Sequence, residues 1–290
     1  MTEELSQGDF RTTRCRLPLE AFLWAEGPDL PPSDLVEKQI WSSIISFPDD
    51  VSIRTSDHHG TELKAMHELW GGWIESFGEK QDAMWYVMLD TADELQACLF
   101  NSLCGFYRVA ASCLRTALEL TTIGTYFQLS LELSDLLKWK EGRYQVKFGM
   151  ACDHLIAHRC TQPLGEYIKS KMNYSIFGQR SPGKPGGWAR KLHSELSDFV
   201  HSLPTHSSGS MWEGSNGPIY VPPSFGKVYA LYLDTVALAY ALVKLARPSF
   251  KLPGVAKHLF HIKQVRPSKV AVYTYEFLFG KDTIHRLLSL

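Results

Sequence analysis

LCGFYRVAASCLRTALELTTIGTYFQL, residues 103–129, is the stretch that decides the fold. At about 100° per residue, its apolar side chains cover most of the circumference of a helix. Its polar side chains fall in one narrow stripe, formed by Arg108, Ser112, Arg115, Glu119 and Thr122. A helix that is apolar on nearly all sides is buried, and charges on a buried helix need partners. The pattern therefore predicts the central helix of a helical bundle.

Helical periodicity continues on both sides of this stretch, and segments rich in Pro and Gly interrupt it. We predict further helices over residues 32–47, 61–77, 81–99, 144–158, 164–172, 188–202 and 225–246. We predict loops over residues 48–60, 174–187 and 203–226. The chain then divides into an N-terminal extension (1–60), a helical bundle (61–247) and a C-terminal extension (248–290).

The C-terminal extension has a different composition from the bundle. Residues 270–279, VAVYTYEFLF, are rich in β-branched and aromatic side chains, which favour strands. The predicted fold class is therefore mainly α, a helical bundle whose N- and C-terminal extensions have room for a few β-strands.

Composition narrows the function classes. The chain has 290 residues, 44% hydrophobic residues and a formal net charge of −1, so it is not a globally basic nucleic-acid binder. Its six cysteines form no CxxC pair, which indicates a reducing cytoplasm. Its N-terminus is acidic and polar, so we do not expect a secretory signal there. The apolar residues 228–246 include Asp234 and Lys244, so we interpret them as a buried bundle helix and expect no membrane partner.

A second polar stripe lies on the helix predicted over residues 188–202. It borders an apolar face and consists of Arg190, His193, Ser194, Ser197 and His201. If this face packs on the central helix, Ser197 and His201 approach Arg115 and Glu119.

These two segments carry a family resemblance. LRTALE at residues 114–119 and ELSDFVHS at residues 195–202, followed by a loop and a long apolar helix, resemble the HEPN-like helical families over residues 81–246. The resemblance is to members with R-x-x-x-E on one helix and L-S-x-x-x-H on a later one. It implies a bundle of four or five helices, a homo-oligomer or protein partner, and a bacterial toxin or antiphage system. Some HEPN-like proteins are metal-independent endoribonucleases.

The chain departs from the catalytic HEPN pattern, in which an Arg precedes a His by four to six residues on one helix. Arg54 and His59 have such a spacing but fall in the loop predicted over residues 48–60. Arg190 and His193 are too close together.

The predicted catalytic group is Arg115, Glu119, Ser197 and His201. His201 would act as general acid or base, since histidine titrates near ~6.5, and Arg115 would stabilise phosphoryl charge. RNA cleavage by its own 2′-hydroxyl needs no metal or other cofactor, so none is predicted. In the alternative interpretation, Arg115 and Glu119 form a buried pair that His201 and Ser197 satisfy, and the protein is a non-catalytic scaffold or binding protein.

A basic segment beside Trp188 is the predicted contact with RNA. Its members are Arg180, Lys184, Arg190 and Lys191, and the alternative for them is a solvated loop. His154 and His158 have the i, i+4 spacing of metal ligands, but the glutamate of the zinc-protease motif and a third ligand are missing. We therefore predict no metal site.

Overall fold

The computed structural model describes residues 47–79, 81–130, 133–178, 186–200, 220–260 and 268–282. Within these residues the chain is helical and contains no strand, which confirms the mainly α fold class. Residues 1–46, with nearly all of the helix predicted over residues 32–47, lie outside the described residues.

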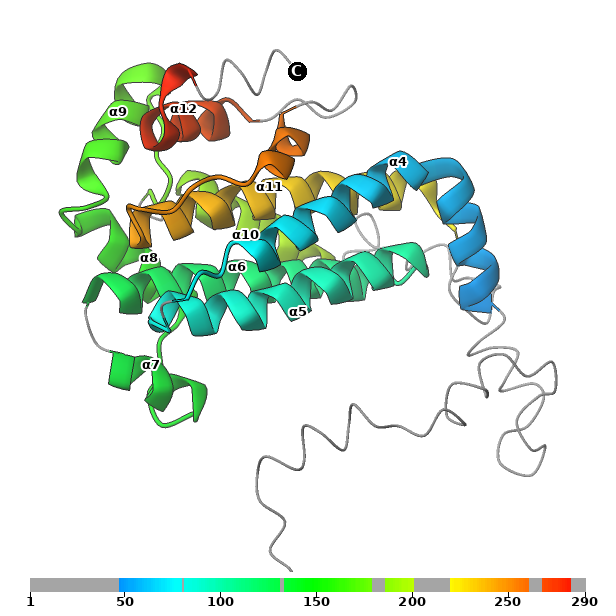
Figure 1. The fold of residues 1–290 in the computed structure, drawn as a ribbon, viewed down its shortest axis with the longest axis horizontal. Helices are drawn as coiled ribbons and strands as arrows, with labels where there is room; N and C mark the ends of the chain where they lie inside the picture. Colours follow the sequence, from blue (N-terminus) through cyan, green and yellow to red (C-terminus); the bar gives the residue numbers. More distant parts are fainter. Residues whose placement is uncertain are drawn as a thin grey trace, which may run out of the picture. The chain divides into compact units, whose positions relative to one another are not determined.

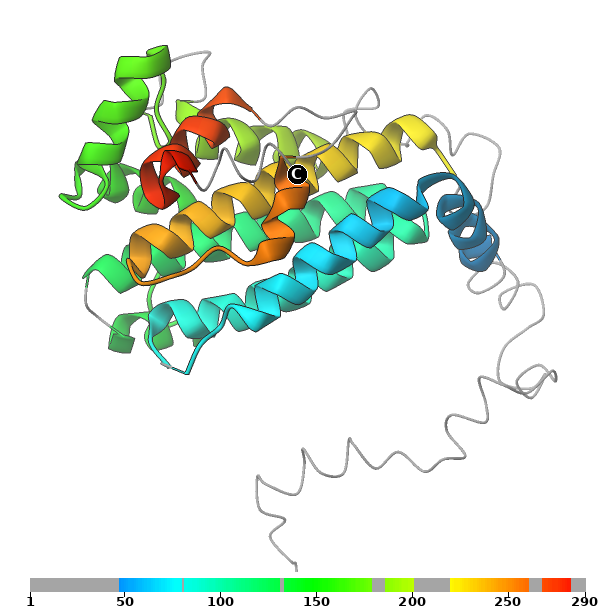
Figure 2. The same cartoon turned by 45° about the horizontal axis from the view of Figure 1, so that its top comes forward.

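Four long helices form a closed ring of contacts. They are α4 (Phe47–Glu75), α5 (Ala83–Leu103), α6 (Tyr107–Ser130) and α11 (Pro222–Ala246). α4 packs on α5, α5 on α6, α6 on α11, and α11 on α4 (Figures 1 and 2). α6 also contacts three shorter helices in addition to α5 and α11, so it has the central place that the sequence predicted.

The remaining elements cover this ring. They are α7 (Leu133–Lys140), α8 (Phe148–Ala157), α9 (Gln162–Met172), α10 (Gly187–Val200), η3 (Gly254–Leu259) and α12 (Lys269–Phe279). α7, α8 and α10 pack on α6, whereas α12 packs on α9 and α11, and η3 packs on α4 and α11. The predicted helices over residues 164–172 and 225–246 correspond to α9 and α11, and α10 begins one residue before the helix predicted from residue 188.

The buried face of α6 explains its central place. Tyr107, Leu114 and Leu118 are fully buried. The hydroxyl of Thr121 donates to the Ala117 carbonyl at 2.9 Å, so this buried polar group is satisfied within its own helix. A Cβ atom on Gly124 would lie 2.7 Å from a Val87 methyl group, so glycine at this position allows α5 and α6 to approach closely.

The loop predicted over residues 48–60 is wrong, because these residues belong to α4. Asp49 and Asp50 lie in its first turn, where acidic side chains favour a helix, and Arg54 pairs with Asp50 at 3.1 Å. The helix is kinked at His59, where φ is −131° and ψ is 26°. The His59 ring stacks on Phe225 of α11 with the ring centres 4.2 Å apart, a contact between distant segments that the local pattern could not reveal.

The strand predicted over residues 270–279 is also wrong, because these residues form α12. The hydroxyl of Ser268 caps the helix by accepting from the Ala271 amide at 3.4 Å. Val270, Ala271, Thr274 and Tyr275 share one buried face at helical spacing. Packing of this face on the bundle outweighs the strand preference of the individual residues.

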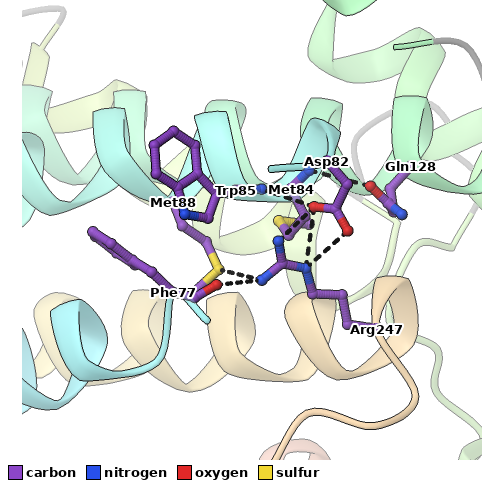
Figure 3. Close-up of polar contacts among 7 residues, drawn as sticks. All are labelled: Phe77, Asp82, Met84, Trp85, Met88, Gln128 and Arg247. Atoms are coloured by element: carbon purple, nitrogen blue, oxygen red, sulfur yellow. Dashed lines mark hydrogen bonds and ion pairs between the residues drawn. The ribbon is translucent and has the colours of Figure 1, made fainter. Parts of the chain in front are cut away.

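A buried ion pair joins the beginning of α5 to the end of α11 (Figure 3). Asp82 is the N-cap of α5 and accepts from the Trp85 amide at 3.1 Å. Arg247 follows α11, donates to Asp82 through Nε and Nη2, and donates from Nη1 to the Phe77 carbonyl at 2.7 Å. The two side chains are only 11% and 13% exposed. We call Asp82 and Arg247 the clamp.

Of the described helices, α11 alone has the length and apolar composition to cross a membrane. However, 83% of its most apolar window is buried inside the fold. These two properties are therefore only weak evidence for a membrane span.

Candidate functional site

α6 and α10 bring three polar side chains together. Arg115 and Glu119 lie one turn apart on α6, and the Arg115 Nε donates to the Glu119 Oε1 at 3.0 Å. His193 of α10 reaches the same carboxylate oxygen through Nε2 at 2.8 Å. The side chains of Arg115, Glu119 and His193 are 30%, 34% and 22% exposed, so solvent reaches all three.

Two contacts fix the imidazole ring of His193. Its Nε2 faces the Glu119 carboxylate, and its flat side stacks on Phe148 of α8, with ring centres 4.2 Å apart and planes 11° apart. Because a carboxylate accepts, Nε2 carries the donated proton, and Nδ1 of a neutral ring is then an acceptor. Nδ1 has no hydrogen-bond partner within the described ranges. The ring is therefore oriented at one nitrogen and available for proton transfer at the other.

The surroundings of Glu119 keep it charged. Its burial raises the pKa of the carboxyl group, but the hydrogen bond from His193 and the charge of Arg115 outweigh burial. The pKa of Glu119 is lowered as a result. An ionised Glu119 remains an acceptor for the His193 Nε2 proton and so holds the orientation of the ring.

These side chains line an open pocket of about 760 Å³ between α6, α10 and the start of α8. A volume of this size lies within the ~300–1,000 Å³ of typical ligand sites. The other residues around the pocket are Ile123, Trp139, Val146, Lys147, Phe148, Gly149, Arg190, Ser194 and Ser197. The Nη1 and Nη2 atoms of Arg115 have no hydrogen-bond partner in the described part of the chain, so they remain free to bind an anion.

Arg190 is held in the wall of the same pocket. Its Nη2 donates to the Gly149 carbonyl at 3.1 Å and to Asp153 at 2.5 Å, and its Nε donates to the Phe177 carbonyl at 3.4 Å. Its side chain is only 10% exposed. These contacts connect α10 to α8, so the first role of Arg190 is to shape the pocket.

The structure brings three of the four predicted catalytic residues to this pocket: Arg115, Glu119 and Ser197. The Ser197 hydroxyl donates to the His193 carbonyl at 2.7 Å, so its proton is used within its own helix. His201 lies outside the described residues, as do Arg180 and Lys184. Lys191 is exposed, lies away from the pocket lining, and is 3.8 Å from Glu195.

His193 is the site residue that the sequence prediction missed. It belongs to the predicted polar stripe, one turn before Ser197, and the stripe was the signal that could have identified it. Its separation from Arg190 is too short for the HEPN spacing, so the resemblance did not select His193 as a catalytic residue.

Arg54 and His59 lie in α4 and not in a loop, so the spacing typical of catalytic HEPN proteins does occur within a helix. Their surroundings differ. The Arg54 side chain is 62% exposed and pairs with Asp50, whereas His59 faces inward and is 3.0 Å from the Tyr220 hydroxyl. Burial lowers the pKa of His59.

His154 and His158 are neighbours, with ring centres 5.7 Å apart. Among the described residues, no group of three or more His, Cys, Asp and Glu side chains is arranged to hold a metal ion.

Comparison with known proteins found no protein-family model, no curated protein and no solved structure that matches this chain.

Proposed function

We propose that the chain is a HEPN-like cytoplasmic protein of bacterial defence or toxin type, and that it is an endoribonuclease that needs no metal. The observation that supports this proposal is the Glu119-bound His193, which lines an open pocket with Arg115, while His193 Nδ1 and the Arg115 Nη atoms have no hydrogen-bond partner among the described residues. The HEPN resemblance supplies the substrate class, RNA, and the expectation of a homo-oligomer or protein partner.

In the proposed reaction, His193 Nδ1 removes the proton of an RNA 2′-hydroxyl group. The 2′-oxygen then attacks the adjacent phosphorus, a 2′,3′-cyclic phosphate forms, and the bond to the 5′-oxygen breaks. The departing 5′-oxygen takes a proton from water, and the His193 imidazolium later returns its proton to solvent. Arg115 pairs with the non-bridging phosphate oxygens as negative charge builds up on them.

The experiment incubates purified protein with structured and unstructured RNA in the presence of a chelator. We expect cleavage by the wild type, and a loss of about 100-fold or more in His193→Ala, the usual size of a general acid–base contribution. Arg115→Lys should lose activity as well, because lysine lacks the guanidinium fork. His154→Ala changes an exposed histidine of α8 outside the pocket lining, so it is the matched control and should keep activity, and His201→Ala tests the residue proposed from sequence. Wild-type protein that leaves every RNA intact would contradict the proposal.

One observation favours a second candidate, a non-catalytic scaffold or binding protein. Arg115, Glu119 and His193 bond to one another, and Arg190 uses three acceptors in the protein. Such a network also orders the packing of α6, α8 and α10. In that case RNA stays intact, and Glu119→Gln destabilises the fold as much as a change in the clamp does.

A further inference from the structure

α11 contains a single acidic side chain, Asp234, in the middle of its buried segment. Its neighbours in sequence, Leu233 and Thr235, are buried. Burial raises the pKa of Asp234 to about 6, and the nearby Glu195 carboxylate contributes to the rise. At neutral pH this helix therefore carries a negative charge at the edge of its buried face.

The Asp234 carboxylate has no ion-pair partner in the described part of the chain. Lys191 and Lys227 lie close enough to lower its pKa, but their ammonium groups are 3.8 Å and 3.5 Å from Glu195. The indole N–H of Trp188 also lowers the pKa of Asp234. Trp188 is only 3% exposed, and among the described residues its Nε1 makes no well-formed hydrogen bond. The indole N–H and the partly exposed Asp234 carboxylate thus interact only weakly, and buried donors such as this one rarely lack a good acceptor.

A pocket of about 130 Å³ opens beside this carboxylate. Asp234, Glu195 and Lys227 provide its polar edge. Leu259 of η3, Phe260 directly after it and Ala271 of α12 provide apolar walls. At ~30 Å³ of liquid volume per water molecule, the space suits only a few heavy atoms. An anion would be repelled by Asp234, and an apolar guest would leave the carboxylate unpaired. A small group that brings positive charge and N–H donors fits both conditions.

We propose that this pocket binds the head group of a small organic cation, a primary ammonium or a guanidinium, with Asp234 as its counter-ion. The apolar walls contact the first carbon atoms of the ligand, and Glu195 lies at the polar edge. This site is separate from the Glu119 pocket, so it does not depend on the proposed ribonuclease function.

The experiment titrates full-length protein with n-butylammonium chloride by calorimetry at pH 7.5. We expect saturable binding and a rise in the melting temperature. Butan-1-ol has nearly the same shape without the charge, and sodium acetate supplies an anion, so neither should bind. Nα-acetyl-lysine amide, whose side-chain amino group is free, carries the same ammonium head group. If this probe binds more tightly than n-butylammonium, the ligand is a lysine side chain of a protein. If n-butylammonium binds more tightly, the ligand is a free amine.

Asp234→Asn keeps the shape of the side chain and removes its charge, so it should fold and weaken n-butylammonium binding at least tenfold. Glu195→Gln is the matched variant, and its loss should be smaller. Equal binding by Asp234→Asn and wild type, or no binding of either amine, would overturn the proposal.

A second measurement needs no variant. Wild-type affinity for n-butylammonium should fall as the pH drops through about 6, where Asp234 gains a proton. Among the described residues, the titratable groups that face Asp234 are Glu195, Lys191, Lys227 and Tyr174, whereas η3 and α12 present non-titrating residues to the pocket. A pH-independent affinity between pH 5 and 8 would contradict the assignment of Asp234 as counter-ion.

Discussion

The clamp and the Glu119 pocket use the same chemistry in opposite settings. In the clamp, Asp82 and Arg247 are 11% and 13% exposed, and the guanidinium also reaches the Phe77 carbonyl. In the pocket, Glu119 and Arg115 are 34% and 30% exposed, and the guanidinium Nη atoms make no hydrogen bond to any described residue. The comparison indicates that solvent exposure, more than the type of residues, decides the role of such a pair. The less exposed pair holds helices together, and the more exposed pair is accessible to a ligand.

The largest effect should come from opening the clamp. Arg247→Ala leaves the Asp82 carboxylate and the Phe77 carbonyl without their partner, so we expect a loss of about 3 kcal/mol in the free energy of unfolding, at the low end for a broken buried pair. Urea unfolding monitored by circular dichroism would measure it. The matched control is Arg143→Ala, which removes an exposed pair with Glu141 and should change stability by less than about 0.5 kcal/mol. Similar losses in both variants would remove the distinction between deep and open pairs.

Asp234 extends the comparison, because it lies about as deep as the clamp residues but has no arginine partner among the described residues. Its pKa is about 6 in the folded protein and ~3.9 in an unfolded chain, so between these values the folded state holds a proton that the unfolded state releases. The free energy of unfolding therefore falls as pH rises from ~4 to ~6, and the charged group costs about 2–3 kcal/mol above that range. Asp234→Asn should be more stable than wild type at pH 7 by about this amount, with no difference near pH 4.

Unfolding curves of both proteins across this pH range would measure the effect. A constant gap between the two proteins would mean that Asp234 does not titrate with the raised pKa.

The smallest effect on stability should come from the pocket. Glu119→Gln removes a pair that is about one-third exposed, so we expect a loss of at most about 1 kcal/mol at pH 7. Because the pKa of Glu119 is lowered in the folded protein, its contribution is present above the unfolded value of ~4.3 and disappears as pH falls below it. In urea unfolding, wild type and Glu119→Gln should therefore differ at pH 7, and the difference should shrink as the pH falls further below ~4.3. If Glu119→Gln lost as much stability at pH 7 as Arg247→Ala, the Arg115–Glu119 pair would be a structural pair like the clamp.

The central helix could be predicted because its signal is local. Most of the circumference of α6 carries buried side chains, and these residues appear in the sequence as an apolar pattern at helical spacing. The stripe of Arg115 and Glu119 could be predicted for the same reason. The strand prediction for residues 270–279 failed because individual preferences were weighed without the helix cap at Ser268 and without the bundle surface that covers α12.

The site was less predictable because its members are far apart in sequence. Glu119 and His193 are separated by 74 positions, and no pattern within one helix selects His193 over the other polar residues of its stripe. The Phe148 ring that orients His193 comes from a third segment. The clamp, formed by residues 165 positions apart, was not predicted at all, since neither partner stands out from its neighbours in sequence.

This long separation has a consequence for biosynthesis. The amino end of α5 leaves the ribosome well before Arg247 is made, so during translation the Asp82 carboxylate has the Trp85 amide and water as partners but not its guanidinium. The ring of α4, α5, α6 and α11 can close only after α11 has been synthesised in full. Nascent chains that stop short of position 247 should therefore expose the apolar faces of three finished helices and become clients of chaperones or proteases.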